Sequence, residues 1–222
     1  MAALTGAAPV LQASQLEHNI STGFDNATGQ FIPIGDPDDD WQMLQTPDEV
    51  LISTGPALSV GTFRRPNPPP GKLGGWIDPE PDGYRWIGHA NSHSNVRADN
   101  PVGHFLFRTT FDLHAGAHDL LFLGSFSVDR SLEMTLNGHT IVEDTEDGRV
   151  EGQLEQWFWV TDQSFFVVGG ENVVEALVYN GGFQMGLALG GWVRSDMPEP
   201  SSLALLLPLL MLGRRSRSAA HR

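Results

Sequence analysis

The sequence predicts an all-β fold, an antiparallel β-sandwich, from three observations. Between about residues 14 and 196, no stretch keeps the 3.6-residue apolar period of an amphipathic helix over three turns. Short runs rich in β-branched and aromatic residues recur instead between clusters of Gly, Pro, Asn and Asp, a pattern typical of sandwiches and barrels. Between two of these runs, Asn137 and Gly138 supply the two positive-φ residues that a type I′ hairpin turn needs. We therefore expect residues 14–196 to form one sandwich domain.

The expected strands follow in chain order. Residues 105–113 alternate, so one face of this strand carries five side chains: Phe105, Phe107, Thr109, Phe111 and Leu113. Residues 119–128 form a second, more apolar strand. The hairpin joins 132–136 to 139–142 and places Met134 opposite Ile141. Four further runs bring the total to seven or eight strands: 157–161, 164–168, 173–180 and 186–194.

Residues 61–102 differ from the rest of this domain. Proline, glycine and asparagine dominate the segment, and residues 66–70 are nearly polyproline. We expect long loops here.

Composition excludes several classes of protein. The 222 residues contain no cysteine, which excludes a disulfide scaffold, a cysteine-ligated metal site and a thiol nucleophile. There are 27 Asp and Glu residues against 13 Lys and Arg, and four of those basic residues lie after Gly213, whereas every acidic residue lies at or before Glu199. An acidic body of this kind repels phosphate backbones, so we expect no nucleic-acid partner.

The C-terminal segment, residues 197–222, has three parts in a fixed order. A short polar lead precedes an apolar run from Leu203 to Leu212, and arginines follow at Arg214 and Arg215. As a short hydrophobic helix, the apolar run would span about 15 Å, against a hydrocarbon core of about 30 Å. The arginines favour the cytoplasmic side, so if the segment inserts, the body lies outside.

This order resembles the PEP-CTERM sorting signal of Gram-negative bacteria. The residues that carry the resemblance are Pro198, Glu199, Pro200, Arg214 and Arg215. The resemblance implies an exosortase-type processing enzyme as partner and export to the cell envelope or extracellular matrix. It also implies membrane contact through the tail before processing. A generic tail anchor is the alternative.

The N-terminal segment, residues 1–13, is similar to the back half of a signal peptide. It is apolar and offers a small-residue cleavage position at Ala13, but it has no basic region. The alternatives are a true start farther upstream, which we favour, and a disordered N-terminus.

The body resembles a galactose-binding-like jelly roll. Three motifs carry this resemblance, and they consist of the following residues: Arg108, Phe111 and Leu113; Leu136, Asn137 and Gly138; Gly170, Asn172, Val174, Ala176, Val178 and Asn180. These motifs are structural, and they occur in carbohydrate-binding and accessory domains of secreted bacterial proteins. The resemblance therefore implies a fold more than a function.

We expect a noncatalytic, exported protein that binds extracellular polysaccharide. A purely structural surface protein without a specific ligand is one alternative. A small secreted hydrolase is the other, although the serine-hydrolase elbow, the H-E-x-x-H metalloprotease motif and the P-loop are absent from the sequence. Glycoside hydrolysis needs a pair of acids, and none stands out among the carboxylates.

Two groups of aromatic residues are candidates for stacking on sugar rings. Trp157 and Trp159 alternate with Phe158, which places both indoles on one face of a strand. Trp76, Tyr84 and Trp86 form a second candidate platform in the loop-rich region. The alternative for each residue is that it covers the core beneath long loops.

Acidic residues near the N-terminus are candidates for a structural calcium site. Asp36, Asp38 and Asp40 lie close together in the chain, and Asp25 could add a further carboxylate. The spacing does not match an EF-hand loop, and a solvated acidic loop is the alternative.

Histidines offer a third candidate site. His89 and His93 are four residues apart, and His104, His114 and His118 follow, so a zinc or copper site is conceivable. Because the sequence around His89 and His93 is typical of a loop, the alternative is a set of solvent-exposed histidines.

Overall fold

The structure is a computed structural model that describes residues 15–47, 55–59, 79–89, 101–128, 130–144, 155–181 and 185–196. These ranges are all-β with antiparallel pairing, as predicted, and their only helical elements are two single 3-10 turns. They hold no helix with the length and apolar content that crossing a bilayer requires. The N-terminal segment 1–13, the expected C-terminal helix and the rest of the segment 197–222 lie outside the described residues.

Thirteen strands are described, against the seven or eight expected. The N-terminal part contributes β1 (Gln15–Asn19), β2 (Phe24–Asp25), β3 (Gln30–Phe31), β4 (Pro37–Gln45), β5 (Gly55–Ser59) and β6 (Ile87–Gly88). The remaining strands are β7 (Gly103–Asp112), β8 (His118–Val128), β9 (Ser131–Leu136), β10 (His139–Asp144), β11 (Gln156–Val160), β12 (Glu171–Asn180) and β13 (Leu187–Asp196). The 3-10 turns are η1 (Glu80–Asp82) and η3 (Gln163–Phe165).

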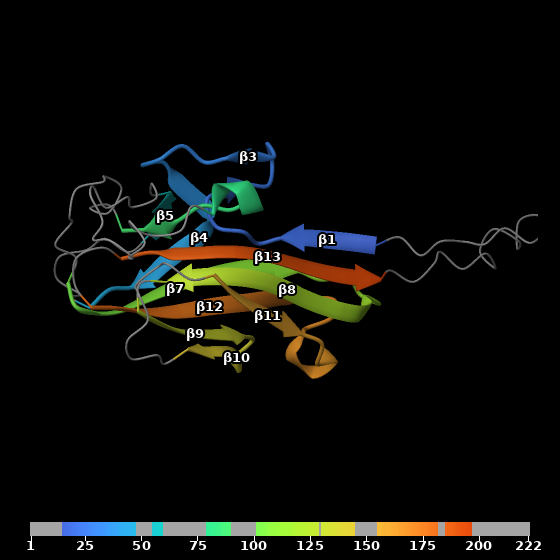
Figure 1. Cartoon of the computed structure of the whole chain (residues 1–222). Coiled ribbons are helices and arrows are strands. Elements are labelled where there is room, and N and C mark those ends of the chain that lie inside the picture. The colour runs from blue at the N-terminus through green and yellow to red at the C-terminus, as the bar shows by residue number, and fades with distance from the viewer. Residues whose placement is uncertain are drawn as a thin grey trace, which may run out of the picture.

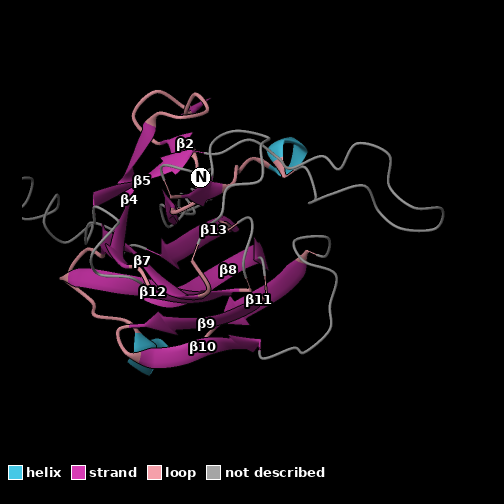
Figure 2. Cartoon of the chain, turned by 90° about the vertical axis from the view of Figure 1, so that its left-hand side faces the viewer, coloured by secondary structure: helices cyan, strands magenta, loops and turns pink. Residues whose placement is uncertain are grey.

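One continuous sheet of eleven strands folds over itself into two layers (Figures 1 and 2). One layer has the order β10-β9-β12-β7-β4, and the other has β13 between β1 and β8, with β11 beyond β8. The short strands β5 and β6 connect β4 to β13, so hydrogen bonds run from one layer to the other along one side. The remaining strands, β2 and β3, pair only with each other among the described residues.

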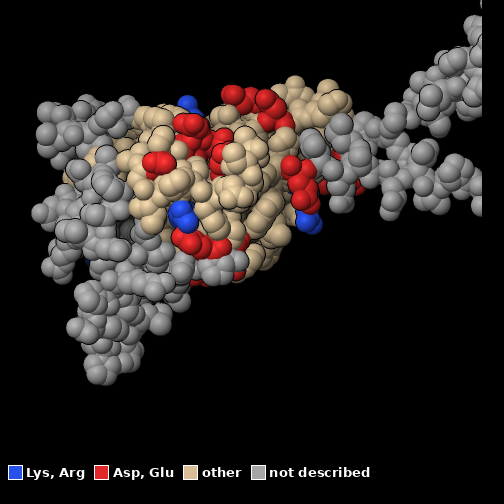
Figure 3. Space-filling view, turned by 90° about the horizontal axis from the view of Figure 1, so that it is seen from above, with Lys and Arg blue, Asp and Glu red and all other residues tan. Residues whose placement is uncertain are grey.

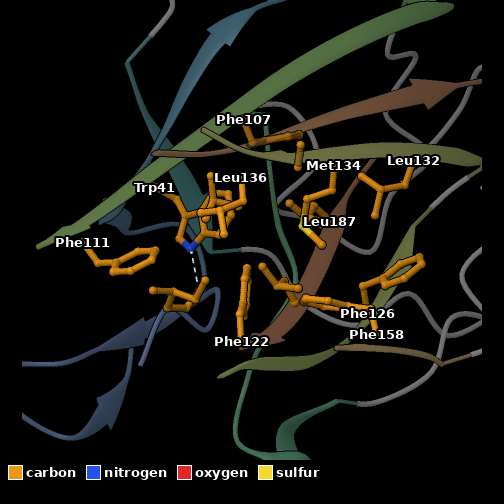
Figure 4. Close-up of a cluster of buried hydrophobic side chains, with 14 of the residues drawn as sticks. Trp41, Phe107, Phe111, Phe122, Phe126, Leu132, Met134, Leu136, Phe158 and Leu187 are labelled. Atoms are coloured by element: carbon orange, nitrogen blue, oxygen red, sulfur yellow. Dashed lines mark hydrogen bonds between the residues drawn. The ribbon is translucent and has the colours of Figure 1, made fainter. Parts of the chain in front are cut away.

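The core lies between the two layers. In one layer, β7 and β12 alternate buried and more exposed residues, so each turns one face to the core. The predicted face of β7 is confirmed: Phe105, Phe107, Thr109, Phe111 and the following Leu113 are all buried. Figure 4 shows side chains from both layers meeting in this core, with the opposite layer contributing Phe122, Phe126, Phe158 and Leu187.

Trp41 on β4 links the core to Ile20, the residue after β1. Its side chain is fully buried, and its indole Nε1 donates a hydrogen bond of 3.1 Å to the backbone oxygen of Ile20 (Figure 4). The backbone N–H of Ile20 in turn donates to the oxygen of Gly191 on β13 at 2.9 Å. Trp41 therefore joins β4 to the strand that lies at the centre of the other layer.

The predicted hairpin is confirmed, with a change in register. Asn137 and Gly138 have φ values of 51° and 80°, the left-handed pair that the tight turn requires. Met134 lies opposite Val142 and not opposite Ile141, because the register shifts between Thr140 and Val142. Such a bulge adds one residue to a single strand of the pair.

Residues 164–168 were expected to form a strand, and this prediction is wrong. They form η3 and the turn after it, because side-chain amides bond their backbone groups in place of a neighbouring strand. The buried Asn172 accepts a hydrogen bond from the N–H of Val167 at 2.8 Å and donates one to its oxygen at 3.0 Å. Asn137 donates to the oxygen of Phe165 and to Asn172 Oδ1, both at 2.8 Å. Two asparagines of the jelly-roll-like motifs thus hold this turn against the hairpin.

The segment 61–102 is described only at residues 79–89, 101 and 102. There it contains η1 and β6 and not only loops. Ile87 of β6 pairs with Leu187 of β13 and with Ser59 of β5, which makes this part of the segment a connection between the layers.

Candidate functional site

Among the described residues, the most exposed aromatic side chains lie two positions apart on β11. The exposed fractions of Trp157 and Trp159 are 61% and 69%, whereas Phe158 between them is buried in the core. The two indoles therefore share the outer face of this layer, about 7 Å apart along the strand. This is the alternation that the sequence predicted.

An apolar row extends this face across three strands. Trp159 pairs with Leu123 of β8, and Leu123 pairs with Trp192 of β13. Leu123 and Trp192 are each half-buried. Directly paired residues carry their side chains on the same face of a sheet, so the three form one row. We call Trp157 together with this row the aromatic surface.

Polar groups stand next to Trp157. Its partner on β8 is Ser125, whose hydroxyl donates to the Tyr84 hydroxyl oxygen at 3.2 Å. Tyr84 in turn donates to Glu155 Oε1 at 2.7 Å, and Glu155 precedes Trp157 by two residues. The aromatic surface thus ends at a carboxylate whose position is fixed by hydrogen bonding.

The Tyr84 phenol stays protonated in this network. Burial is the main cause that raises the pKa of Tyr84 above its ordinary value, and the hydrogen bond to Glu155 adds to the increase. Because the phenol remains neutral, it keeps the proton that it donates to Glu155.

The prediction of a second exposed platform is wrong for Tyr84 and Trp86. Both side chains are fully buried. The ring of Tyr84 packs on the backbone of Gly190, where an added Cβ would come within 2.6 Å of the ring. Trp76, the third residue of that platform, lies outside the described residues.

The four aspartates of the expected calcium site line one groove. Asp25, Asp36, Asp38 and Asp40 all border it, together with Asp39. Figure 3 shows that acidic residues outnumber Lys and Arg on the side of the molecule seen from above in Figure 1.

Local hydrogen bonds occupy several oxygens of these carboxylates. Asp38 accepts from the N–H of Gly23 at 2.7 Å, and Asp40 accepts from Asn26 Nδ2 at 2.8 Å. Asp25 accepts from the Thr28 hydroxyl at 2.7 Å, which, with the N–H of Ala27, lowers its pKa. Within the described ranges, no three of these aspartates bring ligand atoms within 4.8 Å of one another. Calcium binding here stays a prediction.

Asp38 is the carboxylate in this groove with the most perturbed acidity. Its side chain is fully buried, and burial raises its pKa to about 7, with the charge of Asp40 contributing in the same direction. The bond from Gly23 opposes the increase without cancelling it, so Asp38 titrates near neutral pH.

The histidines of the expected zinc or copper site differ in burial. His89 is buried, and the ring of the exposed His104 lies 5.1 Å from that of Tyr179. His93 lies outside the described residues, as do the sorting-signal residues Pro198, Glu199, Pro200, Arg214 and Arg215.

Sequence reasoning found the indole pair but missed its neighbours. Ser125, Tyr84 and Glu155 come from three distant segments, and no local pattern connects them. A partial signal was the small residue Gly190, which leaves room for the Tyr84 ring.

No family model and no curated protein matches the chain. Among solved structures, a β-D-glucuronidase from Dictyoglomus thermophilum is similar at 11% identity and a TM-score of 0.38, over 86% of this chain and 29% of that one. A family 35 carbohydrate-binding module from Clostridium thermocellum is similar at 12% identity and a TM-score of 0.31, over 50% of this chain and 78% of that one.

A glycosyl hydrolase family 2 member from Bacteroides cellulosilyticus shows 14% identity and a TM-score of 0.40, over 70% of this chain and 20% of its own. This chain therefore spans less than a third of the length of either glycosidase. At these TM-scores the similarities assign no function to the chain.

Proposed function

We propose that this chain is an exported, noncatalytic protein that binds extracellular polysaccharide through the aromatic surface. The observation that carries the proposal is the exposure of Trp157 and Trp159 on one face of β11. Single exposed apolar side chains are common on protein surfaces, but a contiguous exposed apolar patch rimmed by polar groups is typical of a binding site.

The chemistry of the surface suits a sugar chain. Indole faces are flat and apolar, and they complement the C–H faces of pyranose rings, while the indole N–H donates to hydroxyls. Glu155 accepts hydrogen bonds from hydroxyls at one end of the surface. Apolar stacking with a few ordered polar groups is the usual composition of a small-molecule site.

We also propose that the sandwich is of the galactose-binding-like jelly-roll type. Its support is the resemblance of the three motifs, together with the role of Asn137 and Asn172. The buried Asn172 and its neighbour Asn137 hold the hairpin and the start of β12 together through side-chain hydrogen bonds. These hydrogen bonds give the two asparagines of the motifs a structural role, and they do not identify a ligand.

The proposed binding is tested by affinity electrophoresis of the full chain against a panel of neutral and acidic polysaccharides. For a polysaccharide that retards the protein, we expect Trp157→Ala and Trp159→Ala each to weaken binding about tenfold, because each removes one stacking contact. Thermal unfolding should change little, since both side chains are exposed.

The matched control is Val168→Ala, which shortens another exposed apolar side chain outside β11. It should leave retardation unchanged. Equal retardation of the parent chain and all variants would show that the polysaccharide binds outside the aromatic surface. No retardation by any polysaccharide would favour a structural surface protein, and release of reducing sugar by the purified chain would favour a hydrolase.

Sorting through the C-terminal segment is a separate part of the proposal. Its support is the order of Pro198, Glu199 and Pro200, the apolar run and the arginines. We expect the exported protein to lack Arg214 and Arg215 after processing by an exosortase-type enzyme. The intact mass of the protein recovered from the envelope decides this, and a mass that includes both arginines contradicts processing.

A further inference from the structure

Three metal-ligand side chains converge at the end of the β8–β13 pair. His118 and Asp119 begin β8, and Asp196 ends β13. One ligand atom of each lies within 4.8 Å of the other two, and His118 Nδ1 is 3.0 Å from Asp119 Oδ2. None of these three residues belongs to the aromatic surface or to the groove lined by Asp25, Asp36, Asp38 and Asp40.

The backbone of both strands departs from regular geometry to bring these residues together. Arg194 pairs with Leu121, and regular pairing would continue with Asp196 opposite Asp119. The register shifts instead between Arg194 and Asp196, so that Asp196 lies opposite His118.

Asp119 completes the convergence. Neighbouring residues of a regular strand point to opposite faces, which would separate Asp119 from His118. Asp119 has a φ of 52°, in the left-handed region, and this interrupts the alternation. Both side chains therefore reach the same point beside Asp196.

The donor set suits a divalent transition metal. An imidazole nitrogen and two carboxylate oxygens are the ligands that zinc accepts alongside water. Arg194 is the nearest cation along β13, and it pairs with Glu17 at 2.8 Å. A single imidazolium would balance only one of the two carboxylates, whereas a divalent ion balances both.

We propose that His118, Asp119 and Asp196 bind one zinc ion. Water fills the remaining coordination positions, because His118 and Asp119 are exposed. The ion ties the last residue of β13 to the first residues of β8, at the point where the chain continues into residue 197. The alternative, an ion pair between His118 and the carboxylates with no metal, is an outcome of the test.

The test is isothermal titration calorimetry of the metal-free full chain with zinc chloride, with calcium and magnesium chloride as comparisons. We expect one zinc site, weakened on the order of 100-fold or more by His118→Gln, Asp119→Asn or Asp196→Asn, since removing a direct ligand costs at least as much as removing an outer partner. Asn tolerates the left-handed conformation, so Asp119→Asn removes the charge without new backbone strain.

The control is His114→Gln, which removes an exposed histidine from the same β7–β8 connection outside the cluster. It should bind zinc as the parent chain does. Zinc should also raise the Tm of the parent chain and of this control, but not that of the three ligand variants. In metal-free buffer all Tm values should agree, which shows that the variants are folded.

Two results would overturn the proposal. One is equal zinc affinity in the parent chain and the three ligand variants, which would place zinc at other histidines. The other is the absence of zinc binding up to millimolar concentration, which would leave only the ion pair.

Discussion

Replacing Trp41 with alanine is expected to remove about 3 to 5 kcal/mol from the free energy of unfolding. The indole is fully buried between the layers, so its removal leaves a large cavity. It also removes the hydrogen bond from Nε1 to the oxygen of Ile20. Since domains of this size are stable by about 5 to 15 kcal/mol, this loss is a large fraction of the total stability. Urea titration followed by circular dichroism measures the loss.

The matched control for this prediction is Trp157→Ala. It deletes the same side chain from an exposed position, and the expected change is within about 0.5 kcal/mol. Trp41→Phe keeps most of the buried ring but not the hydrogen bond, so it should lie between the two. Similar losses for Trp41→Ala and Trp157→Ala would contradict the placement of Trp41 in the core.

The second large effect is a dependence of stability on pH that originates at Asp38. Its pKa is raised from 3.8 to about 7 in the folded protein, so the folded state holds this proton more tightly than the unfolded state does. The resulting stability is fully present below pH 4 and is lost as the pH rises through about 7. The pKa shift of Asp38 corresponds to a loss of roughly 4 kcal/mol in the free energy of unfolding between pH 4 and pH 7.

Asp38→Asn isolates this contribution. The two oxygens of the Asp38 carboxyl accept from the N–H groups of Gly23 and Asp40, one each. Because the amide of asparagine has a single oxygen, Asp38→Asn loses one of these hydrogen bonds. The stability lost in this way does not depend on pH. As the pH rises from 4 to 8, the parent chain should lose the stability that the Asp38 proton provides, whereas Asp38→Asn has no such proton to lose. The free energy of unfolding of Asp38→Asn should therefore increase relative to that of the parent chain. Asp36→Asn removes an exposed charge from the same groove and should follow the parent profile. A pH-independent difference for Asp38→Asn would contradict the buried, protonated carboxyl.

The parts of the fold that the sequence predicted are those with a local signal. Alternation along 105–113 reports a strand with one buried face, and Asn137 with Gly138 specifies a turn without help from distant residues. The same alternation placed Trp157 and Trp159 together on one face. Each of these predictions depended on a period of two or on a φ preference.

The strands that the sequence missed depend on partners elsewhere in the chain. β4 contains Asp38, Asp39 and Asp40, which resemble a solvated loop when considered alone. Asp38 nevertheless points inward and bonds the backbone of Gly23. β2, β3 and β6 have two residues each, too few for any periodic pattern.

The failures at the site have a similar cause. Tyr84 and Trp86 lie in a Gly- and Pro-rich stretch, which indicated exposure. Tyr84 is buried because it lies over Gly190, more than 100 residues later in the chain. In the same way, the convergence of His118, Asp119 and Asp196 depends on a register shift that no local pattern predicts.

The central position of β13 determines the order in which the chain can fold. β13 is the last described strand, yet it bonds β1, β6 and β8. As the polypeptide leaves the ribosome, β1 emerges early, and among the described strands it pairs only with β13, residues 187–196. Pairings of such long sequence separation are slow to form, on the order of milliseconds to seconds. During synthesis this layer is therefore completed only when residues 187–196 have been made, whereas every strand of the other layer is available by residue 180.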